Sequence, residues 1–229
     1  MNTFENKVGL VLPGGGARGA YQIGVLKGIA EILPARVNNP FSVISGTSAG
    51  AINASVIASK ADSFVDAIDL LNDIWGNFKT NRVYKTDSLT MFKSSLHWLV
   101  AIVSGGILVK NPKSLLNNSP LRSLLMESIN LDRIRSNIDD GNLEAFAITA
   151  AGYSSRKSIT FFQSNKKNIT WEKFRREGIE SKIGTDHLMA SVALPLIFPA
   201  VKIDNEFFGD GAMRHATPLS PAIRLGAEK

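Results

Sequence analysis

The fold is decided by the stretch Val43-Ile44-Ser45-Gly46-Thr47-Ser48-Ala49-Gly50-Ala51-Ile52-Asn53, where an apolar run meets a run of small residues. Residues 46–50 form a G-x-S-x-G pentapeptide between a predicted strand at 41–44 and a predicted helix at 49–59. A serine at such a junction sits on a sharp, strained turn, and the two glycines let strand and helix approach closely. The pattern predicts that Ser48 is a nucleophile on an elbow formed by Gly46 and Gly50. The alternative is an ordinary Gly- and Ser-rich loop.

The composition is that of a globular enzyme-sized domain. The chain has 229 residues, of which 44% are hydrophobic and 20% charged, enough for one α/β domain with its own core. There are no cysteines, which excludes disulfides, thiolate catalysis and cysteine-ligated zinc. The three histidines, His97, His187 and His215, lack metal-ligand spacing. We therefore expect no metal and no cofactor.

The formal net charge of +6 suits anionic partners such as phospholipid head groups or nucleic acid, but the positive residues are scattered. Residues 1–7 are polar and have no signal-peptide architecture, and no run reaches the roughly 18 apolar residues of a membrane span. These features predict a cytoplasmic protein or one that contacts a membrane peripherally.

A glycine-rich loop, Pro13-Gly14-Gly15-Gly16-Ala17-Arg18-Gly19, joins a predicted strand at 8–12 to a predicted helix at 20–33. Gly14, Gly16 and Gly19 fit the G-x-G-x-x-G pattern of dinucleotide-binding loops, but the second strand then lacks the acidic residue that binds a ribose. Consecutive glycines also suit an oxyanion hole made of backbone N–H groups. We favour the oxyanion hole, because this loop and Ser48 both fall at the carboxyl edge of one parallel sheet. A tight turn without a ligand is the third interpretation.

The rest of the chain reads as one continuous domain, residues 1–229. Its periodicity and turn residues predict helices at 62–78, 121–129, 132–138, 186–193 and 220–225, strands at 143–150 and 158–162, and a hairpin at 197–208. Residues 91–109 are apolar and predict a cap over the site, a lipid-facing surface or a buried helix, and residues 166–180 are charged and expected to be exposed. A chain that stops after a helix suggests the amino-terminal part of a longer protein.

A serine hydroxyl needs a base to become a good nucleophile. In a triad with the order nucleophile, acid, histidine and with Asp210 as the acid, only His215 follows Asp210, and it would need a local turn to reach Ser48. Asp210 could instead act alone, since it lies between glycines after an aromatic strand end and burial would raise its basicity. An Asp-Gly turn without function is the remaining interpretation of Asp210, and His187 is expected to be structural.

Three motifs together resemble the signatures of patatin-like phospholipases, in the order of that family. They are residues 14–21, Gly-Gly-Gly-Ala-Arg-Gly-Ala-Tyr; residues 46–53, Gly-Thr-Ser-Ala-Gly-Ala-Ile-Asn; and residues 210–212, Asp-Gly-Ala. The segments Ala190–Pro195 and Phe198-Pro199 resemble the part that precedes the family's aspartate. The resemblance spans nearly the whole chain and is weakest at about residues 80–140.

The resemblance implies a three-layer α/β/α sandwich with a mainly parallel central sheet and a calcium-independent lipid acyl hydrolase. It implies that Ser48 is the nucleophile and Asp210 the base of a dyad, beside the Asp-Gly motif residues Gly211 and Ala212. The implied oxyanion hole consists of Gly14, Gly15, Gly16, Arg18 and Gly19, with Arg18 helping to fix the loop. The expected partner is a lipid ester or phospholipid, with no nucleic acid. The alternatives are a catalytically silent lipid-binding or regulatory module, and a nucleotide-binding domain.

Overall fold

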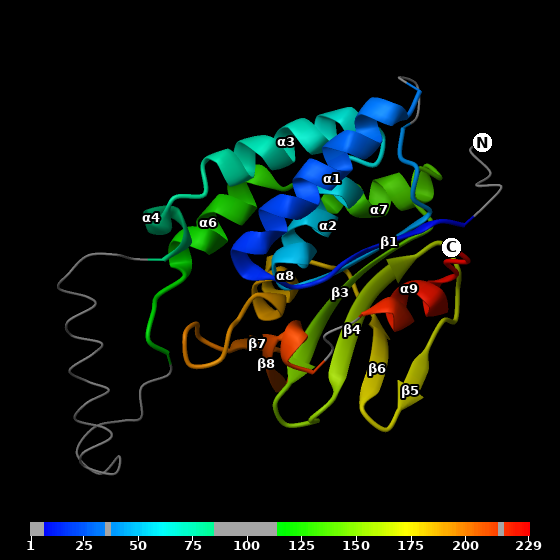
Figure 1. Ribbon diagram of the computed structural model, residues 1–229. Coiled ribbons are helices and arrows are strands. Elements are labelled where there is room, and N and C mark those ends of the chain that lie inside the picture. Colours follow the sequence, from blue (N-terminus) through cyan, green and yellow to red (C-terminus); the bar gives the residue numbers. More distant parts are fainter. Residues whose placement is uncertain (1–6, 35–37, 85–113, 215–217) are drawn as a thin grey trace, which may run out of the picture.

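The computed structural model describes residues 7–34, 38–84, 114–214 and 218–229, and it contains one sheet with helices on both faces (Figure 1). The strands are β1 (Gly9–Leu12), β2 (Val43–Thr47), β3 (Ala145–Gly152), β4 (Ser158–Ser164), β5 (Trp171–Lys173), β6 (Arg176–Glu180), β7 (Val201–Ile203) and β8 (Glu206–Asp210). The α-helices are α1 (Gly19–Ile32), α2 (Ala49–Ser59), α3 (Phe64–Gly76), α4 (Thr80–Val83), α6 (Ser119–Ser128), α7 (Asp132–Asp139), α8 (Thr185–Ser191) and α9 (Leu219–Leu225). Two short 3-10 helices are η1 (Gly16–Arg18) and η2 (Gly211–Met213).

The sheet has the order β1-β2-β3-β4-β6-β5, and β8 also pairs with β3. Strands β1, β2 and β3 are parallel, as are β4 and β6, whereas β3–β4, β3–β8, β5–β6 and β7–β8 are antiparallel. The predicted α/β sandwich is therefore confirmed. Its parallel pairing holds for the three strands around the glycine loop and the elbow, and the rest of the sheet is mixed.

Strand β3 is longer than β2, and this difference in length brings distant parts of the chain together. One edge of β3 pairs first with β2, ending at Thr47 opposite Thr149. The same edge then pairs with β8, which runs in the opposite direction and ends with Asp210 opposite Ala150. Strands β2 and β8 therefore end at adjacent positions along β3, and the residue that follows Thr47 lies beside Asp210.

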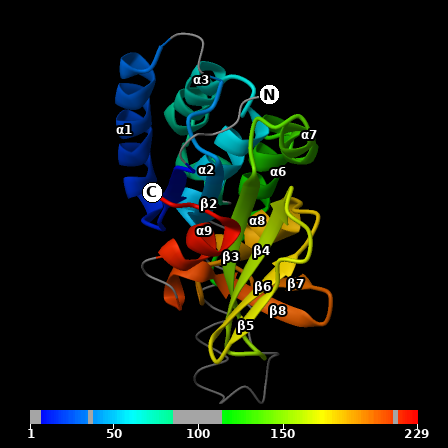
Figure 2. The same cartoon turned by 90° about the vertical axis from the view of Figure 1, so that its right-hand side faces the viewer.

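The helices divide unequally between the two faces of the sheet (Figures 1 and 2). Helices α1, α2, α3, α6, α7 and α8 contribute buried side chains to the larger core, which packs on Ile44, Phe146 and Ile148 of the sheet. Helix α9 covers the opposite face, against Val43, Ala147 and Phe162 among others. Every residue of α2 is buried, because its small and aliphatic side chains allow it to pack between the sheet and the outer helices.

Most predicted elements are present, with ends that differ by a few residues. The main miss is the charged segment 166–180, which contains the edge strand β5 and its neighbour β6, which pairs with β4 and β5. Most side chains of these two strands are exposed, so the segment does not show the apolar pattern of a buried strand. The predicted cap at 91–109, His97 and His215 lie outside the described residues. Within the described ranges, no helix is both long and apolar enough to cross a membrane.

Candidate active site

The elbow predicted from the G-x-S-x-G pattern is present between β2 and α2. Ser48 has φ 55° and ψ −129°, a conformation that costs a residue with a side chain about 1–3 kcal/mol. The glycines on either side are required by close packing: a Cβ on Gly46 would lie 2.6 Å from the Cα of Ala51, and one on Gly50 would collide with the carbonyl of Leu12. The strand, the turn and the first turn of α2 are thus pressed together, with the serine at the tip.

Ser48 and Asp210 meet although they are 162 positions apart, because β2 and β8 end side by side on β3. The Ser48 hydroxyl donates a hydrogen bond to Asp210 Oδ2 at 2.6 Å. The other oxygen, Oδ1, accepts the backbone N–H of Ala212 at 2.8 Å, at the start of η2. Asp210 is 0% exposed and Ser48 is 7% exposed, so the pair is shielded from bulk water.

Burial raises the pKa of Asp210 above its ordinary value, because a buried carboxylate loses its hydration. The hydrogen bonds from Ser48 and from the Ala212 N–H act in the opposite direction, since they stabilise the charged form, but they are the smaller effects. The result is a carboxylate that holds a proton more tightly than an exposed one while its two oxygens keep a fixed orientation.

The glycine-rich loop lies directly against the elbow. A Cβ on Gly14 would lie 3.0 Å from the Cβ of Ser48 and 3.0 Å from that of Ala212, so the loop backbone lies close against the elbow and a side chain there would be tightly packed. The backbone N–H of Arg18 donates to the carbonyl of Gly15 at 3.1 Å and closes the turn of η1. The Arg18 side chain is exposed, and Gly19 is buried against Trp75.

Asn53, from the end of the predicted motif, ties this loop to the helices behind it. Its side-chain nitrogen donates to the carbonyl of Gly19 at 3.0 Å and to Gln22 Oε1 at 2.9 Å. Its side-chain oxygen accepts the indole N–H of Trp75 at 2.8 Å, and Gln22 in turn donates to the carbonyl of Pro13 at 2.8 Å. The buried amide of Asn53 therefore fixes both ends of the loop relative to α2 and α3.

A cavity of about 410 Å³ opens next to Ser48. Nearly all of its lining is apolar, and the side chains come from η1, α1, α2, α4, α6 and the segment after α8 as well as from α3. They include Ala20, Ile52, Trp75, Phe78, Val83, Leu121, Val192, Leu194 and Phe198. Such a cavity can hold a hydrocarbon chain with its reacting end at the serine.

The segment at the end of α8 contacts the backbones of both Ser48 and Asp210. The Ser191 hydroxyl accepts the backbone N–H of Ser48 at 2.9 Å and donates to the carbonyl of Thr149 at 2.7 Å. The carbonyl of Ala193 accepts the backbone N–H of Asp210 at 2.8 Å. Asn53 and Ser191 lie in segments that resemble the family, and the spacing in the predicted helix 62–78 makes Trp75 a core residue, but sequence reasoning assigned none of the three a role in the site. Their contacts with the loop and the elbow depend on the tertiary fold.

The contacts of His187 with the described residues are structural, as the sequence analysis predicted. Its Nδ1 accepts a hydrogen bond from the backbone N–H of Gly184 at 3.1 Å. Its ring packs edge-on against the ring of Phe161, with 4.6 Å between the ring centroids. Burial lowers the pKa of His187, which favours the neutral ring that this hydrogen bond requires. His215, the other histidine weighed as a base, is not among the described residues.

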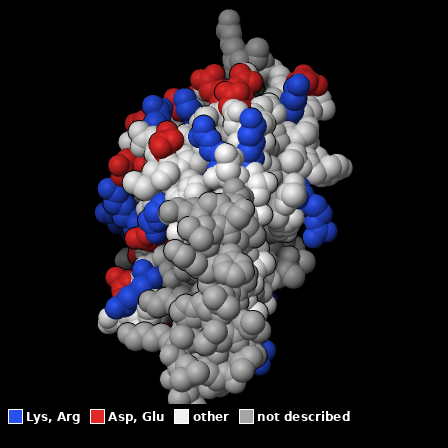
Figure 3. All heavy atoms as spheres, turned by 90° about the vertical axis from the view of Figure 1, so that its left-hand side faces the viewer, with Lys and Arg blue, Asp and Glu red and all other residues white. Residues whose placement is uncertain are grey.

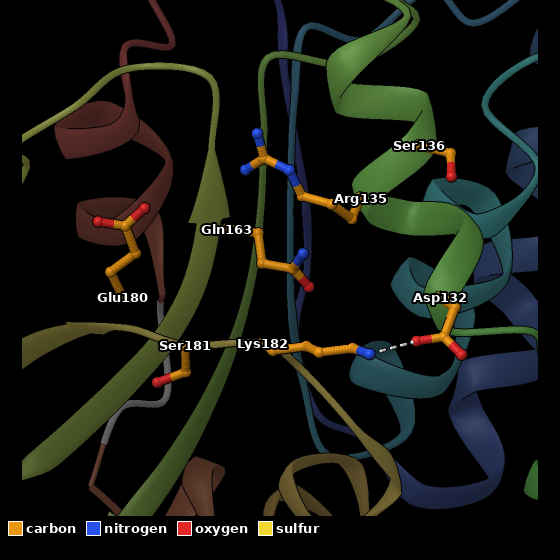
Figure 4. Close-up of a pocket in the computed structure, with 7 residues that line it drawn as sticks. All are labelled: Asp132, Arg135, Ser136, Gln163, Glu180, Ser181 and Lys182. Carbon is orange, nitrogen blue, oxygen red and sulfur yellow. Dashed lines mark ion pairs between the residues drawn. The ribbon is translucent and has the colours of Figure 1, made fainter.

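A second cavity, of about 620 Å³, lies between α7 and the strands β4 and β6 (Figure 4). Its lining is polar: Asp132, Arg135 and Ser136 come from α7, Gln163 from β4, and Glu180, Ser181 and Lys182 from the end of β6 and the residues after it. Lys182 forms an ion pair with Asp132 at 2.9 Å, and Arg135 is paired with Asp139. The cavity contains no residue that the sequence analysis singled out.

Two further observations limit what the surface can bind. On the face that lies on the side of α4, Lys and Arg are interspersed with Asp and Glu and form no single basic patch on the part drawn in colour (Figure 3). Among the described residues, no group of three or more His, Cys, Asp or Glu side chains could hold a metal ion.

Comparison with known proteins gives matches of three kinds. The family model for patatin-like phospholipases matches residues 10–223. The lysophospholipase nte1 of Aspergillus terreus is 49% identical over 55 residues, which cover 24% of this chain and 3% of that protein's length. The crystal structure of VipD from Legionella pneumophila aligns with 93% of this chain and 47% of that chain, with 16% identity and a TM-score of 0.48.

Proposed function

The chain belongs to the patatin-like phospholipase family, and from this premise we propose that it is a serine acyl hydrolase that cleaves lipid esters. The observation that carries the proposal is the hydrogen bond of 2.6 Å from the Ser48 hydroxyl to Asp210, in a water-poor site beside bare backbone. Ser48 is the nucleophile and Asp210 is the base.

In the first half of the reaction, Ser48 Oγ attacks the ester carbonyl carbon while its proton moves to Asp210 Oδ2. The raised pKa of Asp210 favours this transfer, because a more basic carboxylate is a better proton acceptor. The tetrahedral intermediate collapses, the bond to the leaving oxygen breaks, and Asp210 returns the proton to the departing alcohol. The acyl group stays on Ser48.

In the second half, water attacks the acyl carbonyl and gives a proton to the same carboxylate. Collapse of the second intermediate releases the fatty acid, and Asp210 returns the proton to Ser48 Oγ. Asp210 thus serves as acceptor and donor in turn, the task that a histidine performs in a triad.

The oxyanion hole is formed by the backbone N–H groups of residues 14–16, with Arg18 and Gly19 closing and anchoring the loop. This assignment is supported by the close approach of the Gly14 backbone to Ser48, where an added Cβ would lie 3.0 Å from the Ser48 Cβ. Fixed N–H groups stabilise the developing negative charge on the carbonyl oxygen, which is among the largest contributions in acyl transfer.

The apolar cavity is the proposed acyl-chain site, since it lies next to Ser48 and its lining offers few polar partners. Leu194, which lines the cavity, and Leu196, two residues later in the chain, are 39% and 67% exposed. Exposed apolar side chains of this kind suit peripheral contact with a lipid surface. The substrate is therefore a lipid ester or phospholipid.

The test is hydrolysis of short-chain esters, lysophospholipid and phospholipid vesicles, combined with labelling by a fluorophosphonate probe. Wild-type protein should be labelled and should release fatty acid, with turnover unchanged in excess EGTA. Ser48→Ala should abolish both, with a circular dichroism spectrum and Tm close to those of the wild type. Full turnover by Ser48→Ala would contradict the assignment of the nucleophile. Vesicle binding by the wild type without labelling or turnover would favour a silent lipid-binding module instead.

A further inference from the structure

Ser48 lies between β2 and α2, and its backbone N–H takes part in the hydrogen bonding of neither element. The ladder of β2 ends at Thr47, and α2 begins at Ala49. A buried N–H at such a junction needs an acceptor, and here the acceptor is the Ser191 hydroxyl at 2.9 Å. Ser191 is 0% exposed, so water does not compete for the bond.

The Ser191 hydroxyl uses its own proton as well, which it donates to the carbonyl of Thr149 at 2.7 Å. Thr149 is the residue of β3 that pairs with Thr47, and the next residue, Ala150, pairs with Asp210. A hydroxyl can donate one hydrogen bond and accept others at the same time. Ser191 therefore links the tip of the elbow to the position on β3 where β2 and β8 meet.

Two residues later the same segment holds the other member of the pair, since the carbonyl of Ala193 accepts the N–H of Asp210 at 2.8 Å. Residues 191–193 thus bind the backbone of the serine on one side and of the aspartate on the other. The side-chain bond between Ser48 and Asp210 spans the gap between two backbones that this segment holds apart at a fixed distance.

We propose that Ser191 is a positioning residue, whose hydroxyl holds the Ser48 backbone so that Oγ stays aligned with the Asp210 carboxylate. The inference rests on the proposed function of Ser48 and Asp210. Without this acceptor, the N–H of Ser48 is buried and unpaired. The hydrogen bond that helps to hold Ser48 in its strained backbone conformation is then lost, and the backbone can relax. A shift of the elbow then moves Oγ away from both the carboxylate and the glycine loop.

The test compares Ser191→Ala with Ser55→Ala. Ser55 is a matched control, because its buried hydroxyl also donates to a backbone carbonyl, that of Ala51 at 2.7 Å, but does not contact the elbow amide. Ser191→Ala should lower kcat for a short-chain ester and the rate of fluorophosphonate labelling by about 10- to 100-fold, with KM changed by less than about threefold. Ser55→Ala should keep both rates within about twofold, whatever its effect on Tm.

The pH dependence of kcat distinguishes a positioning role of Ser191 from a loss of stability, because a loss of stability alone does not shift it. The Ser48 hydroxyl lowers the pKa of Asp210 by its hydrogen bond. When that bond is weakened in Ser191→Ala, the acidic limb of the kcat profile should therefore move to higher pH. Ser191→Cys, which keeps the volume but accepts hydrogen bonds poorly, should show the same changes and serves if the alanine variant does not fold.

A folded Ser191→Ala or Ser191→Cys protein that is labelled at the wild-type rate would overturn the role of Ser191. A fall in rate equal to that of Ser55→Ala would also overturn it. Absence of labelling in the wild-type protein would instead contradict the proposed function, so the two failures are distinguishable.

Discussion

Two of the cavities described above, one polar and one apolar, differ in how far their polar side chains are exposed to water. The polar cavity of about 620 Å³ includes charged side chains that are exposed to water: Lys182 and Asp132, which form its ion pair, are 79% and 78% exposed. The apolar cavity of about 410 Å³ is lined in part by Ser48, which is almost completely buried and whose hydroxyl donates a hydrogen bond to the fully buried Asp210. Exposed charges are solvated and screened by salt. A buried carboxylate loses its hydration, so its pKa rises and it accepts a proton from a neighbouring hydroxyl more readily. Burial therefore distinguishes the Ser48–Asp210 pair from the ion pair of the polar cavity, whereas cavity volume does not point to the proposed site.

Changing a carboxylate to an amide at Asp210, the partner of Ser48, and at Glu180, in the polar cavity, should give the largest contrast. Asp210→Asn removes the proposed base and should lower kcat by about 10⁴-fold, the scale seen when a catalytic acid is removed from a hydrolase. Glu180→Gln, the matched change in the polar cavity, should leave kcat within about twofold. Steady-state kinetics on one soluble ester measure both. Near-normal rates for Asp210→Asn would place the base elsewhere, with His215 as the next candidate.

A change in acyl-chain preference of about tenfold is expected when a side chain that lines the apolar cavity is shortened. Trp75→Ala enlarges the cavity and should shift the preference toward longer acyl chains by about tenfold or more, measured as a ratio of kcat/KM across an ester series. Trp75→Phe is the control for the lost hydrogen bond to Asn53, because it removes the indole N–H but keeps most of the ring volume. An unchanged chain-length profile in Trp75→Ala would remove this cavity from acyl binding.

Burial of Asp210 should also cost stability in a pH-dependent way. Because its pKa is raised in the folded state, folding favours the protonated form. The contribution of Asp210 to stability is fully present below the ordinary pKa of an aspartate. It is lost as the pH rises through the raised pKa of Asp210 in the folded state. Asp210→Asn cannot ionise, so its Tm relative to the wild type should increase from pH 4 to pH 8. A constant difference over that range would argue against a raised pKa.

The smallest effect is expected where the charges are most exposed. Lys182→Ala breaks the ion pair with Asp132 and should change the free energy of unfolding by less than about 1 kcal/mol, with kcat unchanged. Urea unfolding with and without 0.5 M salt measures it. A larger loss, or any loss of turnover, would mean that the polar cavity matters to the site and would break the contrast between the two regions.

Local patterns in the sequence predicted the parts of the site that depend on local geometry. The elbow follows from the spacing of Gly46, Ser48 and Gly50, because strand, turn and helix can pack that closely only with glycines there. Asp210 was found because an Asp-Gly pair follows an aromatic strand end. In both cases the residue types and their spacing carry the information.

The parts that could not be predicted depend on contacts between distant segments. The bond between Ser48 and Ser191 joins residues 143 positions apart, and nothing near Ser191 shows which way its hydroxyl points. The meeting of β2 and β8 depends on the extra residues of β3, from Ala150 to Gly152, whose pairing the sequence does not reveal. Strands β5 and β6 were missed because most of their side chains are exposed, so neither shows the apolar run of a buried strand.

The most direct test of the central claim is the rate at which a fluorophosphonate labels Ser48, measured against pH in the wild type and in Asp210→Asn, with the adduct located by peptide mass spectrometry. The account predicts labelling on Ser48 that slows in the wild type as the pH falls through the raised pKa of Asp210. It predicts slow labelling of Asp210→Asn with no dependence on pH over that range. An adduct on another residue, or an Asp210→Asn protein labelled at the wild-type rate with the same profile, would contradict it.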